Sequence, residues 1–255
     1  MIIKEVKCKT ALSKSNLPGL DYSLNPYRGC QHACAYCYVP NILRIKRSEW
    51  GSFVNVRTNI PTILSKELRT KKPGVVAIST VTDPYQPVEK KYKITRYCLE
   101  QLLIRDFPVC IQTKSDLITR DLDLISKFSN AEVMFSIATL NDSERKLLEP
   151  FSSPIKNRLD AMKEISDTGI NTSVFFGPVY PTVKSDDLES IINRFIENGA
   201  TEIMLDKLNL KPGIKQSVEQ ALKSDISNNL SNYDLIRTKV FEVSKGKDIK
   251  IVDAF

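Results

Sequence analysis

The stretch Asn25-Pro-Tyr-Arg-Gly-Cys30-Gln-His-Ala-Cys34-Ala-Tyr-Cys37-Tyr-Val-Pro40 places three thiols within eight residues. Cysteine thiolates are the usual ligands of iron-sulfur clusters, and the Cys-x3-Cys-x2-Cys spacing supplies three of them. A cubane has four irons, so one iron would stay open for another molecule. The motif therefore predicts a [4Fe-4S] cluster held by Cys30, Cys34 and Cys37.

This spacing resembles the radical S-adenosylmethionine superfamily, in which the open iron lies next to a bound sulfonium. The resemblance implies S-adenosylmethionine (SAM) as cosubstrate and an external one-electron reductant as partner. Radical chemistry of this kind is carried by the cofactors rather than by side chains. The rest of the chain is therefore searched for groups that would hold the cosubstrate.

Zinc is the main alternative occupant of the motif. A structural zinc site needs four Cys or His ligands, while the only histidine, His32, lies inside the loop and Cys8 would be a distant fourth ligand. A zinc knuckle usually repeats its cysteine pair, and this chain does not. The sequence favours the cluster and leaves a non-catalytic iron-sulfur or zinc-binding protein as an alternative.

Length and composition indicate a single α/β domain without a membrane segment. The 255 residues are 42% hydrophobic and 26% charged, and no apolar run approaches the roughly 20 residues of a membrane span. The first residues lack the pattern of a signal peptide. We expect a cytoplasmic protein that does not contact a membrane.

The formal charge of +7 is unevenly distributed. The segment 41–72 follows the cysteine motif and carries eight Lys or Arg against two Glu. A basic surface attracts polyanions, so the segment predicts a nucleic-acid partner. The alternative is a solvated helix face, and the substrate is then a peptide or a small molecule. The basic residues are Arg44, Lys46, Arg47, Arg57, Lys66, Arg69, Lys71 and Lys72.

Short apolar runs alternate with longer helical patterns over most of the chain. Alternation of this kind gives a parallel sheet with right-handed crossovers. Six units predict a partial (β/α)6 TIM-type barrel, which we place at 1–210. The expected strands are 20–24, 75–79, 109–113, 132–137, 172–176 and 202–205. The expected helices are 61–69, 94–105, 121–128, 142–148, 155–168 and 186–198.

After residue 210 the alternation stops. The segment 211–255 contains two polar helical patterns, 218–222 and 233–243, and a short β pattern at 249–252. We expect this C-terminal helical extension to pack on the barrel.

Residues that directly follow the expected strands are candidates for cosubstrate binding, because barrel active sites lie at the carboxyl ends of the strands. SAM has an amino group, a carboxylate, a ribose and an adenine. Asp83 with Thr82 suits the amino group, Lys114 the carboxylate, Ser136 the ribose or carboxylate, and Tyr36 the adenine. Taken singly, Asp83-Pro84 is typical of a turn and Lys114 of a surface lysine.

Several segments narrow the resemblance to the spore photoproduct lyase-like radical proteins, often labelled DNA repair photolyase. The resemblance covers roughly residues 20 to 210 and implies a 5′-deoxyadenosyl radical that abstracts hydrogen from a substrate. The segments that carry it are Asn25 to Cys30, Thr82 to Pro87, Thr113 to Ser115 and Glu149-Pro150.

One position departs from that family. In the lyase a cysteine directly precedes the Thr/Ser-Asp pair and returns hydrogen to the product radical, whereas this chain has Val81. Cys98 lies on the apolar face of its expected helix and is predicted to be core. Cys110 shares strand parity with Lys114 but lies ~13 Å below it at ~3.3 Å per residue. The chain therefore resembles the lyase in radical initiation and differs from it in the step that ends the reaction.

Overall fold

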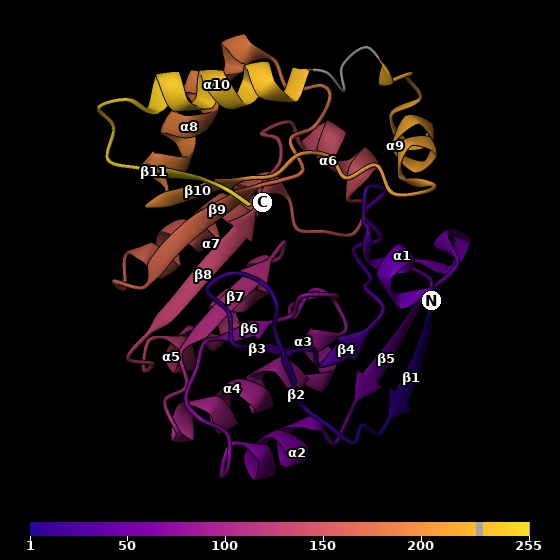
Figure 1. The fold of residues 1–255 in the computed structure, drawn as a ribbon, viewed down its shortest axis with the longest axis vertical. Coiled ribbons are helices and arrows are strands. Elements are labelled where there is room, and N and C mark those ends of the chain that lie inside the picture. The colour runs from indigo at the N-terminus through magenta and orange to yellow at the C-terminus, as the bar shows by residue number, and fades with distance from the viewer. Residues whose placement is uncertain (228–231, 255) are drawn as a thin grey trace.

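The computed structural model describes residues 1–227 and 232–254 and contains a main sheet in the order β11-β10-β9-β8-β7-β6-β3-β2 (Figure 1). All six predicted strands are present in it and run parallel. β2 and β11 form its two edges, so the sheet is an open, partial barrel, as predicted. The six strands are β3 (Tyr22–Leu24), β6 (Val76–Ile78), β7 (Val109–Thr113), β8 (Ala131–Ser136), β9 (Asn171–Phe176) and β10 (Glu202–Leu205).

The two faces of this sheet differ in polarity. Along β7, the buried Val109, Ile111 and Thr113 alternate with the half-buried Cys110 and Gln112. Successive strand residues point to opposite faces, so Val109 and Ile111 pack in the hydrophobic core on the helix side. The other set faces the inside of the barrel.

Helices between the strands cover the outer face of the sheet. The predicted helices are present to within about two residues, except that the one expected at 121–128 is a single α-turn after the 3-10 turn Asp116–Asp121. None of the described helices combines the length and apolarity needed to cross a bilayer. Their bounds are α1 (Val39–Leu43), α2 (Ile60–Glu67), α3 (Glu89–Tyr92), α4 (Ile94–Ile104), α5 (Leu122–Ile125), α6 (Asp142–Leu148), α7 (Ile155–Ser166) and α8 (Leu188–Glu197).

A second sheet, in the order β1-β5-β4, was not predicted. β1 (Ile2–Val6) pairs in parallel with β5 (Phe53–Arg57), and β5 pairs antiparallel with β4 (Tyr27–Arg28). β1 is mostly exposed, and its sequence does not show the apolar run that marks a buried strand. β2 (Leu12–Lys14), which pairs antiparallel with β3, was missed as well. The small sheet fixes the point at which the three-cysteine segment leaves β4.

The segment after residue 210 forms α9 (Ile214–Leu222), α10 (Tyr233–Ser244) and β11 (Lys250–Asp253). β11 continues the main sheet by pairing in parallel with β10. α10 packs on α8 and α9 packs on α6. Ile214 and Val218 of α9 also share a small hydrophobic cluster with Cys34 and Tyr36, so this segment reaches the three-cysteine loop.

Candidate active site

The cluster loop, defined here as residues 29–38, joins β4 to α1. Gly29 begins it at φ 91°, and a Cβ there would lie 2.4 Å from the carbonyl oxygen of Phe53, so only glycine fits. Cys30 and Cys34 are each 8% exposed, and Cys37 is half-buried. Burial raises the pKa of all three thiols, that of Cys30 to about 12. A bound metal would displace their protons.

The donor set of this loop fits a cluster. The thiols of Cys30 and Cys37 lie close enough to Cys34 for their charges to raise its pKa. Cys34 and Cys37 also belong to the small hydrophobic cluster that Tyr36 and α9 form. Within residues 1–227 and 232–254, no three Cys, His, Asp or Glu side chains stand close enough together to hold a single metal ion. A cluster does not need such an arrangement, because each of its cysteines binds a different iron.

Hydrogen bonds tie the first half of the cluster loop to the segment after β6. The Thr82 hydroxyl donates to the Gly29 carbonyl at 2.6 Å and accepts from Gln86 Nε2 at 2.9 Å. The Gln86 side-chain oxygen accepts from the Gln31 amide at 2.9 Å. Asn25 accepts from the amides of Thr80 and Val81 at 3.0 and 3.1 Å. Val81 therefore lies in a turn that Asn25 holds.

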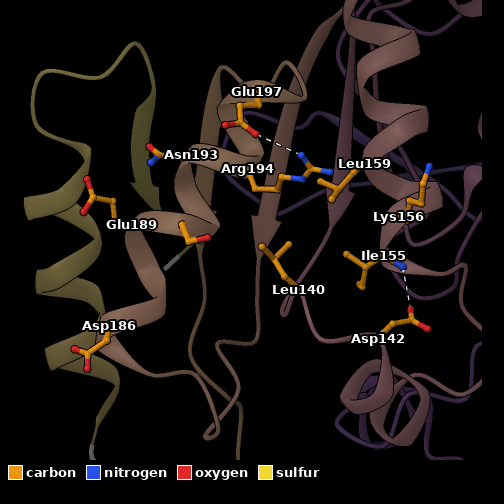
Figure 2. Close-up of a pocket in the computed structure, with 11 residues that line it drawn as sticks. Leu140, Asp142, Ile155, Lys156, Leu159, Asp186, Glu189, Asn193, Arg194 and Glu197 are labelled. Carbon is orange, nitrogen blue, oxygen red and sulfur yellow. Dashed lines mark hydrogen bonds and ion pairs between the residues drawn. The ribbon is translucent and has the colours of Figure 1, made fainter.

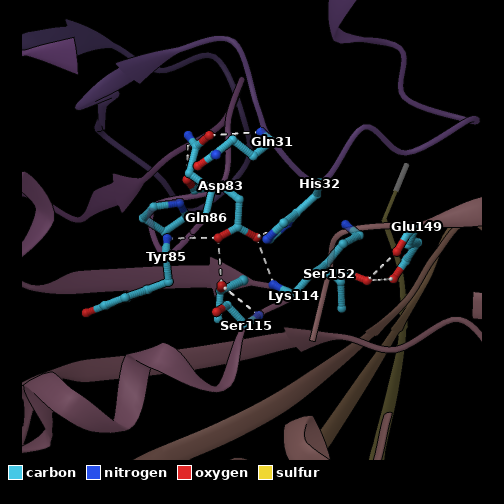
Figure 3. A network of polar contacts seen from close by, with 12 residues as sticks. Gln31, His32, Asp83, Tyr85, Gln86, Lys114, Ser115, Glu149 and Ser152 are labelled. Carbon is cyan, nitrogen blue, oxygen red and sulfur yellow. Dashed lines mark hydrogen bonds and ion pairs between the residues drawn. The ribbon is translucent and has the colours of Figure 1, made fainter. Parts of the chain in front are cut away.

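Asp83 is buried and is surrounded by donors from this chain (Figure 3). Its carboxylate accepts from the Tyr85 amide at 2.9 Å, the Thr113 hydroxyl at 2.8 Å and the Lys114 amide at 2.8 Å. His32, 1% exposed, places Nδ1 3.3 Å from Asp83 Oδ2. Burial alone would raise the pKa of Asp83, but His32 and these donors lower it to about 2. Asp83 thus links the β6 and β7 ends to the cluster loop.

Glu149, which follows α6, is the shared partner in a second network of hydrogen bonds at the site. It is 1% exposed and accepts from the hydroxyls of Tyr36 and Tyr180, the latter at 3.2 Å. Arg158 of α7 pairs with it at 2.5 Å and also donates to the Ser136 carbonyl at 2.7 Å. Burial would raise the pKa of Glu149, but Arg158, followed by Lys114 and Tyr36, lowers it to about 2.

Lys114 and Ser136 lie on neighbouring strand ends that face the inside of the barrel. Lys114 Nζ lies 5.8 Å from the centre of the Tyr36 ring. Burial opposes its charge, but Cys34, Glu149 and Asp83 together raise the pKa of Lys114. The Ser136 hydroxyl accepts from Gln112 Nε2 at 3.1 Å. The structure therefore brings Tyr36, Lys114 and Ser136 together beside the loop.

Sequence reasoning missed Glu149, Arg158 and Tyr180 as parts of this site. Glu149 was noted only as part of a family motif, and Arg158 resembles any helix-surface arginine in the sequence. Its burial, at 0% exposure, follows from the pairing with Glu149, which sequence alone does not reveal.

The two remaining barrel cysteines lie where the sequence placed them. Cys98 is fully buried in the main core, which confirms the prediction. Cys110 faces the barrel interior low on β7, opposite Glu132 in the strand register. Burial, with Glu132 and Glu202 nearby, raises its pKa to about 12.

The basic segment 41–72 does not form one surface. Arg47 turns inward and donates to the Cys37 carbonyl at 2.9 Å and to Asn41 Oδ1 at 2.8 Å. Arg57 donates to the Asn25 carbonyl at 3.1 Å. Figure 1 shows α2, which carries Lys66, below α4 and far from α1. Of the eight basic residues, Arg44 and Lys46 are the two exposed ones next to α1.

A cavity of about 910 Å³ lies away from this site, between α7 and α8 on the outside of the barrel (Figure 2). Four acidic residues, Asp142, Asp186, Glu189 and Glu197, line it against two basic ones, Lys156 and Arg194. Its size reflects a shallow groove between helices, and the strand ends do not contribute to it.

A smaller cavity of about 570 Å³, here called the rim cavity, lies at the ends of β9 and β10. Tyr180 lines it and also contacts Glu149 and Tyr36, so the cavity and the cluster loop share a wall.

An open parallel barrel with a three-cysteine loop at its carboxyl rim defines the class of enzymes that start reactions from a cluster and a sulfonium cosubstrate. The comparisons agree: residues 24–195 match the Radical SAM superfamily, and the chain belongs to this family. Its cofactors are therefore a [4Fe-4S] cluster and SAM. When bound, they supply a 5′-deoxyadenosyl radical for hydrogen abstraction.

Three relatives show what the chain is similar to. An uncharacterized protein of Methanocaldococcus jannaschii is 34% identical over 255 residues, which cover 98% of this chain and 95% of that protein. Spore photoproduct lyase complexed with dinucleoside spore photoproduct has a TM-score of 0.75 at 13% identity, covering 99% of this chain and 82% of the lyase. Streptococcus suis SuiB bound to precursor peptide SuiA has a TM-score of 0.64 at 16% identity, covering 93% and 50%.

Proposed function

We propose that this radical SAM enzyme abstracts hydrogen from a nucleic-acid substrate. The observation that carries the proposal is a group of four basic residues, here called the rim cations: Arg44 and Lys46 directly after α1, and Lys207 and Lys211 in the segment after β10. Asn41 Nδ2 donates to the Pro212 carbonyl at 3.0 Å, which brings the first pair next to Lys211. Lys207 is the second residue after the end of β10. No carboxylate of the described residues forms an ion pair with these four.

We propose Cys30, Cys34 and Cys37 as the cluster ligands and Tyr36, Lys114 and Ser136 as cosubstrate contacts. Their convergence on one rim supports this assignment. Thr82 and Asp83 are engaged by donors and acceptors of this chain. Their direct contact with the SAM amino group stays a prediction, and their internal bonds support a role in positioning the loop.

The division into a catalytic barrel, 1–210, and a C-terminal extension, 211–255, is also a proposal. The packing of α9 against α6 and against the small cluster around Tyr36 supports it. On this view the extension closes one side of the site and adds Lys211 to it.

The step that ends the reaction is expected to differ from that of spore photoproduct lyase. Val81 cannot donate hydrogen, and its side chain stands in the turn that Asn25 fixes. Cys110 lies too deep in the barrel to replace it at the rim. A transferase or isomerase outcome fits these residues as well as a lyase outcome.

Anaerobic turnover with deuterated DNA, tRNA and peptide pools tests the substrate class. Transfer of deuterium from a nucleic acid to 5′-deoxyadenosine is expected. Transfer from peptides alone would favour the second candidate, for which the likeness to peptide-bound SuiB is the supporting observation. The protein with Cys37→Ala serves as the control that should form no 5′-deoxyadenosine.

Binding provides a second test with a matched control inside the basic segment. Each phosphate contact contributes a slope of about −0.9 to the logarithm of affinity against the logarithm of salt for duplex DNA. Arg44→Gln with Lys46→Gln should reduce the slope by about 2, whereas Lys71→Gln with Lys72→Gln should leave it unchanged. Equal effects of the two pairs would contradict the assignment of the rim cations.

A further inference from the structure

The only tryptophan of the chain, Trp50, lies in the turn that joins α1 to β5. This turn is built on the short 3-10 helix Arg47–Glu49, and the Trp50 amide donates to the Arg47 carbonyl at 3.0 Å. The indole is half-buried, but its ring nitrogen Nε1 is buried, and no oxygen or nitrogen of the described residues accepts a hydrogen bond from it. A buried donor without such a partner costs stability and therefore needs an explanation.

The turn around Trp50 packs directly against the cluster loop. On one side of Trp50, Arg47 donates to the Cys37 carbonyl at 2.9 Å. On the other side, Gly51 has φ 84°, and a Cβ there would lie 2.4 Å from the Cβ of Ala33. Only glycine fits so close to the loop, so the turn is held against it both before and after Trp50.

The sulfur of Cys37 is the acceptor within reach of the Trp50 indole N–H, and the Val39 amide is a second donor to the same sulfur. A protonated thiol accepts hydrogen bonds only weakly. A thiolate bound to iron carries negative charge and accepts them better. Hydrogen bonds to the sulfurs are also among the factors that set the reduction potential of an iron-sulfur cluster.

We propose that Trp50 is a positioning residue that acts through Cys37: its indole N–H donates to Cys37 Sγ and makes the cluster easier to reduce. The electron that reduces a cluster adds negative charge to its sulfurs, so a donor stabilises the reduced form more than the oxidised form. This inference rests on the proposed role of Cys37 as a cluster ligand. It adds a side chain from outside the cysteine motif to the groups that control radical initiation.

The single tryptophan allows the contact to be tested in the unmutated chain. Protein expressed with tryptophan that carries ¹⁵N in the indole ring is labelled at Trp50 alone. After anaerobic reconstitution and reduction without SAM, pulsed EPR should show a ¹⁵N coupling to the cluster spin that unlabelled protein lacks. Absence of this coupling in protein with full iron content would overturn the hydrogen bond.

The reduction potential measures the consequence of the contact. Replacing tryptophan by benzothienylalanine during expression changes only Trp50, keeps the shape of the ring and puts sulfur in place of the N–H. At a fixed potential, the ratio of reduced to oxidised cluster should fall about threefold, because a single hydrogen bond contributes about that factor or more. For one electron this is a shift of about −30 mV, since a tenfold change corresponds to 59 mV. Trp50→Phe, which also lacks the N–H, should shift the potential in the same direction.

Phe53→Leu is the matched control, because it changes packing beside the cluster loop without removing a donor. A Cβ on Gly29 would lie 3.1 Å from the Phe53 ring, which places this ring at the start of the loop. Phe53→Leu should leave the potential unchanged. An equal fall in Phe53→Leu and Trp50→Phe would attribute the effect to packing, and it would overturn the proposal. An unchanged potential in the benzothienylalanine protein would overturn it as well.

The failure of the inference can be told apart from the failure of the proposed function. Iron content and thermal unfolding show whether each variant has folded and holds its cluster. If Cys37→Ala kept the wild-type EPR spectrum, the assignment of Cys37 as a ligand would itself be wrong. None of these measurements uses a nucleic acid, so a negative result for Trp50 leaves the proposed substrate class standing.

Discussion

At the rim of the barrel, the segments after β6 and after β10 each carry an aspartate, and the two carboxylates differ in their surroundings. Asp83 accepts from three donors of this chain and lies 3.3 Å from His32, and its pKa is lowered to about 2. For Asp206, burial raises the pKa, and the backbone hydrogen bond and charge of Lys207 offset it only in part. Hydrogen bonds and a neighbouring cation stabilise the ionised form of a buried carboxyl, whereas burial with few donors makes ionisation costly.

The largest loss of unfolding free energy is expected when the buried Arg158–Glu149 ion pair is broken. Arg158→Met leaves the buried Glu149 carboxylate without its charged partner. Removing one member of a buried pair typically costs about 3–5 kcal/mol of unfolding free energy. Urea denaturation of the cluster-free protein measures this loss without interference from the cofactor.

The exposed pair Lys156–Asp160 on the same helix is the control for Arg158. Lys156→Met should change the unfolding free energy little, because exposed pairs contribute little. Adding Glu149→Leu to Arg158→Met should recover part of the loss, since the uncompensated charge is then gone. A loss below about 1 kcal/mol in Arg158→Met would show that Glu149 is not held as described.

Asp83→Asn removes a buried carboxylate, and its effect on the unfolding free energy should depend on pH. A carboxyl whose pKa falls from 3.8 to about 2 on folding stabilises the protein above the unfolded value. The variant should lose about 2 kcal/mol at neutral pH. This difference from the wild type should shrink as pH falls from about 4 toward 2, because the wild-type Asp83 carboxyl then becomes protonated first in the unfolded and then in the folded protein.

Urea denaturation at several pH values measures that dependence. Glu164→Gln, an exposed change on α7, controls for the general effect of removing one negative charge. A difference between Asp83→Asn and the wild type that stayed constant down to the acid limit would contradict the ionised state of Asp83.

A smaller effect is expected at Asn25, which holds the turn around Val81. Asn25→Ala removes the acceptor for the amides of Thr80 and Val81. A lost hydrogen bond of this kind costs about 1 kcal/mol. Asn25→Asp keeps the acceptor and should retain most of the stability, so similar losses in both variants would argue against the hydrogen-bond explanation.

The parallel strands and the loop chemistry were predictable from sequence because both have local signals. Apolar runs such as 109–113 mark strands, and the three cysteines mark the metal motif without any knowledge of the fold. The β1-β5-β4 sheet was not predictable in this way: β1 is largely exposed and pairs with β5 about 50 residues away.

The electrostatic surface was the least predictable feature. The count of charges along the sequence grouped Arg47 with Lys66. In the structure, Arg47 donates a hydrogen bond to the cluster loop, whereas Lys66 lies on α2, far from α1 (Figure 1). The rim cations instead combine Arg44 and Lys46 with two lysines some 160 residues later. Such grouping depends on the contact between Asn41 and Pro212, which a sequence read in order does not contain.

The smallest effect, and the one of opposite sign, is expected at Asp206. Its folded pKa lies above the unfolded value, so stability falls as pH rises through the unfolded pKa, and the full loss is present above the folded pKa. Asp206→Asn should therefore raise the unfolding free energy at neutral pH by about 0.5 kcal/mol, a typical gain from one relieved site. The gain should vanish at low pH, where the wild-type carboxyl is protonated. If Asp206→Asn destabilised the protein as Asp83→Asn does, the carboxylate would be part of the internal network, and the contrast between the two ends of the rim would no longer hold.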